Sequence, residues 1–143
     1  MTIEEQLQQD GYILSLSAGA SMRPMLTQRT EQLLIEKLNA DPKVNDVVLF
    51  KRRNGKYVLH RIIRKYDGKY LIRGDNCYDR EMVCFDQIIG ILKGFYRGSR
   101  YIDCRSNKTY LCYVAFWRIT YPVRFAFHIF LQFIRRVISG FRR

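Results

Sequence analysis

The sequence is short of the residues that usually build metal sites and disulfide frameworks. It has four cysteines, none of them in a Cys-x-x-Cys pair, and two histidines among 143 residues. Cysteines spaced in this way do not form a zinc site, and a chain of this length can bury a core without disulfides. We therefore expect reduced thiols, no metal and no cofactor.

Acidic residues are missing from the C-terminal part of the chain. From Cys104 to the C-terminus there are eight Lys/Arg and no Asp or Glu. Residues 1–50 carry four Lys/Arg against seven Asp/Glu, whereas residues 51–143 carry 21 against six. This asymmetry within a formal net charge of +12 points to an anionic partner, such as membrane lipid, nucleic acid or an acidic peptide.

An apolar targeting segment is also missing from the start of the chain. Residues 1–6 are mostly polar, with two glutamates, unlike a signal peptide or a membrane anchor. The sequence has no internal repeat and no low-complexity linker. Because 48% of the residues are hydrophobic, a disordered chain is excluded, and one globular domain is expected.

Short apolar runs separated by turn residues predict a mainly β domain over residues 1–104. A short helix comes first, with a capping box over residues 2–5 and an end at Gly11. Asn54-Gly55 and Asp67-Gly68 are hairpin signals. The expected strands are residues 12–16, 33–38, 47–51, 57–63, 69–73 and 88–96, of which 33–38 also fits a helical turn. Consecutive strands with tight turns favour a coiled antiparallel sheet or partial barrel.

Residues 105–143 form a basic, aromatic tail with helical periodicity. Between residues 123 and 139, polar side chains recur at steps of three or four and leave a wide apolar face. This polar stripe consists of Arg124, His128, Gln132, Arg135 and Ser139. Only ten residues separate Arg124 from Arg135, whereas a membrane-spanning helix needs about 20 apolar ones. The pattern therefore predicts an amphipathic helix that lies on a surface.

An anionic membrane is the expected partner of this helix. Arginine side chains can reach lipid headgroups while phenylalanine side chains enter the acyl region. The predicted contact residues are Arg124, Phe127, Phe130, Arg135 and Arg136. This contact would place the protein in the cytoplasm, peripheral on the inner face of the membrane. Packing of the helix on the β domain, or against a second copy, is the alternative.

Ser21 is the candidate nucleophile, because small residues and a proline shape the turn around it. Gly19 and Ala20 leave the backbone unobstructed before the hydroxyl. Pro24 has a fixed φ and favours an extended conformation for Arg23. A serine on a rigid, open turn just after a strand is suited to nucleophilic attack. The alternative is an ordinary loop serine before a proline.

His60 is the candidate general base, because a serine hydroxyl is a weak nucleophile until an imidazole takes its proton. The other histidine, His128, lies on the polar stripe of the tail, where solvent or lipid headgroups would surround it. Asp75 belongs to a Gly-Asp-Asn turn after the next strand, where it could accept the second imidazole N–H. Asp79 and Glu81 are further candidates for this role. A structural histidine and an ordinary turn are the alternatives.

Four segments resemble, in order, the sequence boxes of the signal peptidase I superfamily of serine peptidases (families S24 and S26). They are Gly19-Ala20-Ser21-Met22-Arg23-Pro24, Asp46-Val47-Val48-Leu49-Phe50, His60-Arg61-Ile62-Ile63 and Gly74-Asp75-Asn76. Many bacterial members carry a lysine where this chain has His60, so the chain is similar to the Ser–His branch. The likeness covers roughly residues 12–95.

The resemblance implies a fold of the signal-peptidase or LexA-like type. It also implies an endopeptidase that cuts precursor or leader peptides after small side chains. By motif match, Ser21 is the nucleophile, His60 the general base and Asp75 the aspartate of the Gly-Asp-Asn box. Gly19 stands where many signal peptidases have a serine that helps to bind the oxyanion. This difference leaves the backbone amides of Ser21 and Ala20 for that role.

The transmembrane anchors of signal peptidases have no counterpart in this sequence. The chain is therefore similar to a compact, stand-alone form that could trim the leader of a ribosomally made peptide beside an exporter. Two other functions are open: an inactive peptide-binding module of the same fold and a nucleic-acid-binding regulator. The regulator is disfavoured because no helix-turn-helix pattern precedes the peptidase-like region. The oligomeric state is open.

Overall fold

A computed structural model describes residues 1–27 and 30–141 of the chain, which divides into two compact units. The first unit comprises residues 1–111 and the second residues 112–143. The sequence predicts a division after residue 104. The observed division lies later, because the first turn of the next helix carries Tyr110, whose ring contacts Arg61 and Phe95 of the first unit.

The N-terminal helix α1 spans Ile3–Asp10 and has the predicted caps. The Thr2 hydroxyl accepts a hydrogen bond from the Glu5 N–H at 3.2 Å, and the Glu5 carboxylate accepts one from the Thr2 N–H at 2.7 Å. Gly11 ends the helix with a φ of 79°, which a residue with a Cβ rarely adopts. Leu7 is the buried residue of α1. The local capping signal therefore fixes both ends of the helix.

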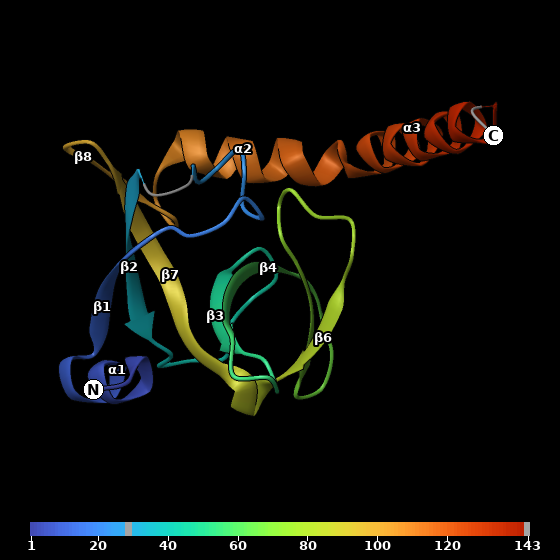
Figure 1. Ribbon diagram of the computed structural model, residues 1–143. Helices are drawn as coiled ribbons and strands as arrows, with labels where there is room; N and C mark the ends of the chain where they lie inside the picture. Colours follow the sequence, from blue (N-terminus) through green and yellow to red (C-terminus); the bar gives the residue numbers. More distant parts are fainter. Residues whose placement is uncertain (28–29, 142–143) are drawn as a thin grey trace. The chain divides into compact units, whose positions relative to one another are not determined.

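Within residues 1–27 and 30–141, eight strands form one antiparallel sheet, which confirms the predicted mainly β fold class. They are β1 (Tyr12–Leu16), β2 (Glu31–Lys37), β3 (Val47–Lys51), β4 (Tyr57–Lys65), β5 (Lys69–Arg73), β6 (Glu81–Cys84), β7 (Ile88–Arg97) and β8 (Arg100–Asp103). Their order is β1-β2-β7-β3-β4-β5-β6, and β8 pairs with β7. The sheet is strongly curved but not closed, because β1 and β6 are its two ends (Figure 1).

Two short strands, β6 and β8, have no counterpart among the predicted strands. Each has four residues, which is too few for an alternating pattern to appear in the sequence. A 3-10 turn, η1 (Phe85–Gln87), joins β6 to β7. The expected strand over residues 33–38 is confirmed as β2, which begins two residues earlier.

The core lies against the central strands, and β3 is buried on both faces. The main cluster contains Val48, Phe50, Ile62, Tyr70, Ile72, Val83, Ile88 and Ile91. On the other face of β3, Val47 and Leu49 are also buried. The alternation of side chains along a strand therefore gives β3 one face in the core and one face toward the cavity described below.

The C-terminal helices are α2 (Lys108–Ile119) and α3 (Tyr121–Phe141). The helix predicted between residues 123 and 139 is confirmed within α3. Where the two helices join, the Arg124 guanidinium lies 3.7 Å from the centre of the Trp117 ring and donates a hydrogen bond to the Trp117 carbonyl at 2.6 Å. Among residues 1–27 and 30–141, no helix combines the length and the apolar character needed to cross a bilayer.

A buried ion pair between Arg61 and Asp75 joins β4 to the turn that follows β5. Arg61 Nε donates to Asp75 Oδ1 at 2.8 Å, and Nη2 donates to Oδ2 at 2.7 Å. The remaining donors of Arg61 reach the Asn45 carbonyl at 2.8 Å, the Tyr110 hydroxyl at 3.1 Å and the Met25 sulfur at 3.1 Å. A buried guanidinium is tolerated only with such partners.

We expect Asp75→Asn to destabilise the first unit strongly, because it leaves the Arg61 charge buried without a counter-ion. Breaking one side of a buried pair costs about 3–5 kcal/mol in free energy of unfolding. Urea denaturation monitored by circular dichroism measures this loss of stability. The matched control is Glu36→Gln, which breaks the exposed pair between Lys93 and Glu36 and should change stability much less. Equal losses in the two variants would contradict this account.

Candidate active site

The turn that carries Ser21 follows β1 and is fastened to the body of the first unit. Ser17 Oγ donates to the Thr27 carbonyl at 2.5 Å, which closes the loop. Arg97 Nη2 donates to the Met25 carbonyl at 2.6 Å. The side chains of Met22, Met25 and Leu26 are buried, whereas Ser21 is half-buried. The apolar residues therefore anchor the turn and leave the serine at the surface of a cavity.

Gly19 has a φ of +82°, in the left-handed region that favours glycine. This backbone conformation accounts for the glycine at this position. Within the described parts of the chain, the N–H groups of Ala20 and Ser21 have no hydrogen-bond partner. Both amides are therefore available to donate a hydrogen bond to a ligand.

The Gly-Asp-Asn turn contacts the Ser21 turn directly. The Asn76 N–H donates to the Ser21 carbonyl at 2.7 Å, and Asn76 Nδ2 donates to the Ala20 carbonyl at 3.1 Å. A Cβ atom on Gly74 would lie 2.6 Å from the Ser21 carbonyl oxygen and 3.0 Å from His60 Nε2. Only glycine permits this close approach, so the Ser21 carbonyl and His60 Nε2 both lie against Gly74.

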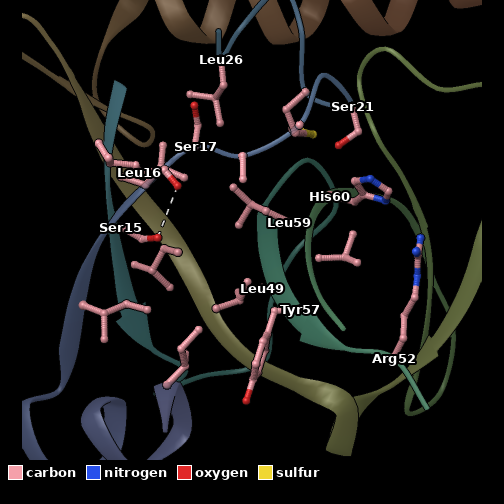
Figure 2. A pocket seen from close by; sticks show the side chains of 18 of the residues that line it. Ser15, Leu16, Ser17, Ser21, Leu26, Leu49, Arg52, Tyr57, Leu59 and His60 are labelled. Carbon is pink, nitrogen blue, oxygen red and sulfur yellow. Dashed lines mark hydrogen bonds between the residues drawn. The ribbon is translucent and has the colours of Figure 1, made fainter. Parts of the chain in front are cut away.

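His60 lies in the middle of β4 and is 7% exposed. Its Nε2 lies on the side of Gly74 and Ser21, and Figure 2 shows the Ser21 and His60 side chains next to each other at the rim of the cavity. Its Nδ1 lies 3.5 Å from Glu81 Oε1. In the part of the chain that the structure describes, Nδ1 has no hydrogen-bond partner. Hydrogen bonds of catalytic groups are often long before a substrate binds.

The three acidic candidates occupy different places in the structure. Glu81, the first residue of β6, is the one whose carboxylate approaches the imidazole. Asp75 is occupied by the bidentate pair with Arg61, and Asp79 is exposed in the segment before β6. The structure therefore favours Glu81 over Asp75 and Asp79 as the group that orients His60. The buried guanidinium of Arg61 explains the different role of Asp75.

One residue of the site, Arg52, was not singled out in the sequence. Its Nε donates to Glu81 Oε2 at 3.0 Å and its Nη2 donates to Glu81 Oε1 at 2.6 Å. Arg52 lies between Lys51 and Arg53 at the end of β3. In the sequence, such a run of cationic residues is typical of a solvent-exposed hairpin. Only the nearby Asn54-Gly55 signal indicates that this segment belongs to a hairpin.

Burial and neighbouring charges set the protonation state of the site. Burial lowers the pKa of His60 below its usual value of 6.5, and Arg52 lowers it further, while Glu81 acts in the opposite direction. The hydrogen bonds from Arg52 hold the pKa of Glu81 below its usual value. At neutral pH the site therefore holds a neutral imidazole, able to accept a proton, beside an ionised carboxylate.

A cavity of about 480 Å³ opens beside these residues (Figure 2). Its lining is mainly apolar, with Ser21, His60 and Arg52 among its polar members. Other lining residues come from α1, β1, β2 and the β3–β4 hairpin and include Ile3, Ile13, Leu16, Leu33, Leu49, Tyr57 and Leu59. Successive residues 15–19 also line it, so the end of β1 and the chain after it run along one wall. The cavity can therefore accommodate an extended apolar ligand beside Ser21.

The predicted membrane contacts all lie in the second unit, on α3. Phe127 and Phe130 are 60% and 56% exposed, and Arg135 and Arg136 are exposed as well. Arg124 is half-buried against Trp117. At about 100° per residue, the two phenylalanines lie about 60° apart around α3, and Arg124 and Arg135 lie about 100° to one side of them.

Comparison with known proteins adds no further constraint. No protein-family model matches the sequence, and a search of curated proteins finds no significant match.

The buried, neutral state of His60 should make stability depend on pH. The unfolded chain takes up a proton near pH 6.5, whereas the folded state resists protonation of His60 until lower pH. Stability should therefore fall as the pH decreases from 6.5 through the pKa of the folded state. Urea denaturation at several pH values should show a smaller decrease for His60→Gln than for the wild type. A histidine NMR titration with a His60 midpoint at or above 6.5 would contradict this prediction.

Proposed function

We propose that the chain is a serine endopeptidase of the Ser–His branch of the signal peptidase I superfamily, cleaving a precursor or leader peptide after small residues. The observation that carries the proposal is the placement of Ser21 and His60 Nε2 against Gly74, with Glu81 3.5 Å from the opposite ring nitrogen, beside a cavity. The four sequence boxes in order support the same assignment. The neutral imidazole suits the role of general base.

In the proposed reaction, His60 Nε2 takes the proton of the Ser21 hydroxyl as its oxygen attacks the scissile carbonyl carbon. The backbone N–H groups of Ala20 and Ser21 stabilise the oxyanion of the tetrahedral intermediate. The imidazolium then gives its proton to the leaving amine as the peptide C–N bond breaks, which leaves an acyl ester on Ser21. Water, deprotonated by His60, hydrolyses this ester and restores the hydroxyl.

Glu81 acts in this reaction through His60. The carboxylate favours the tautomer with a proton on Nδ1, which leaves Nε2 free to accept the serine proton. It also stabilises the imidazolium that forms during attack. No metal or cofactor takes part in the proposed steps.

Replacement of Ser21 or His60 should abolish cleavage without loss of the fold. Because the two groups act together, Ser21→Ala and His60→Gln should each lower the rate by at least about a thousandfold. The wild type and variants are incubated with a proteome-derived peptide library, and the cleavage sites are identified by mass spectrometry. Ser15→Ala is the matched control, because Ser15 also lines the cavity but lies away from His60.

Equal cleavage by wild type and Ser21→Ala would contradict the proposed activity. Binding of library peptides without cleavage by the wild type would instead favour an inactive peptide-binding module of the same fold.

We also propose that α3 holds the protein on the inner face of the cell membrane, where the peptidase would meet precursors beside an exporter. The exposed Phe127 and Phe130 side chains and the arginines that flank them support an interfacial position. The absence of acidic residues after Asp103 favours anionic lipid over a second copy, because two such helices would repel each other.

The full chain should therefore float with vesicles that contain phosphatidylglycerol and not with pure phosphatidylcholine vesicles. Added salt should weaken this binding by screening the arginines. Phe127→Ser with Phe130→Ser should abolish flotation, whereas Tyr66→Ser, which changes an exposed aromatic residue of the first unit, should not. Retained flotation of the double variant would contradict the proposal. Salt-resistant dimers in analytical ultracentrifugation, without flotation, would assign the apolar face to a second copy.

A further inference from the structure

We infer that Arg52 is a positioning residue that holds the Glu81 carboxylate against the Nδ1 side of His60. The consequence for catalysis rests on the proposed function, whereas the arrangement of the three side chains does not. Arg52 belongs to the β3–β4 hairpin, Glu81 begins β6, and His60 lies in β4.

 The three side chains therefore come from separate parts of the chain, and the fold alone brings them together.

The backbone of Arg52 is fixed by the hairpin. Its N–H donates to the Lys56 carbonyl at 2.9 Å, and its own carbonyl accepts from the Gly55 N–H at 2.9 Å. The side chain is half-buried and extends along the wall of the cavity toward His60 (Figure 2). The guanidinium is thus presented from a rigid turn.

The contact between Arg52 and Glu81 is bidentate, which fixes the plane of the carboxylate. Nε and Nη2 of the guanidinium each bind a different carboxylate oxygen, at 3.0 and 2.6 Å. Oε1, the oxygen bound at 2.6 Å, is also the one that lies 3.5 Å from His60 Nδ1. A paired guanidinium thus limits the rotation of the carboxylate that faces the imidazole.

The other charged and titratable groups around His60 do not replace this contact. Asp75 is engaged with the buried guanidinium of Arg61. Cys77 lines the same cavity, and burial raises the pKa of its thiol. Glu81 is therefore the carboxylate placed to receive the Nδ1 proton, and Arg52 is the cation that holds it there.

The protonation of the two ring nitrogens of His60 reports this arrangement, and it can be measured without peptidase activity. In ¹⁵N-labelled Ser21→Ala protein, NMR should show His60 mainly as the tautomer protonated at Nδ1. In Arg52→Gln, both tautomers should be populated. Arg52→Lys keeps the positive charge but cannot form the bidentate contact, and it should give an intermediate spectrum. Arg53→Gln is the matched control, because Arg53 is exposed on the same hairpin. A His128→Gln variant identifies which NMR signals belong to the second histidine.

In protein with peptidase activity, Arg52→Gln should lower kcat/KM by about tenfold or more, and Arg52→Lys should restore part of it. In a Glu81→Gln background, Arg52→Gln should have little further effect, because Arg52 acts through Glu81. An Arg52→Gln spectrum identical to that of Arg53→Gln, in protein folded by circular dichroism, would overturn the inference. Loss of the tautomer preference in a protein that cleaves no peptide would support the positioning role and count against the proposed activity.

Discussion

The buried pair between Arg61 and Asp75 is the interaction on which the geometry of the site depends. A guanidinium removed from water must find a carboxylate and further acceptors. Arg61 finds them in the turn after β5, in the loop before β3 and at Met25 in the turn that carries Ser21. Asn76, next to Asp75, then bonds to the Ser21 carbonyl. The pair thus links the strand that carries His60 to the turn that carries Ser21.

The same constraint separates the tasks of the two carboxylates. His60 and Arg61 are neighbours on β4, so their side chains point to opposite faces of the strand. Asp75 serves the Arg61 face, where a buried charge needs it. Glu81 is held by Arg52 and faces the imidazole. One acidic group therefore stabilises the fold, and another is placed for the proposed chemistry.

Local signals were sufficient to predict much of the fold. The capping box of α1 and the Asn54-Gly55 turn act within a few residues, and both appear as expected. The short strands β6 and β8 depend on pairing with distant partners, which no local pattern reveals. The choice of Glu81 over Asp75 depends on the burial of Arg61, and the role of Arg52 depends on a bidentate contact across 29 positions of sequence. Neither could be read from residue types and spacing.

The central claim is that Ser21 forms a covalent intermediate with a peptide carbonyl carbon. The most direct measurement is to quench the reaction with acid soon after mixing wild-type protein with a peptide that it cleaves, and to locate any acyl adduct by tandem mass spectrometry. The account predicts an adduct on Ser21 that carries the N-terminal fragment of the peptide and is absent from His60→Gln. Cleavage that proceeds equally in Ser21→Ala, without any adduct at this position, would contradict it.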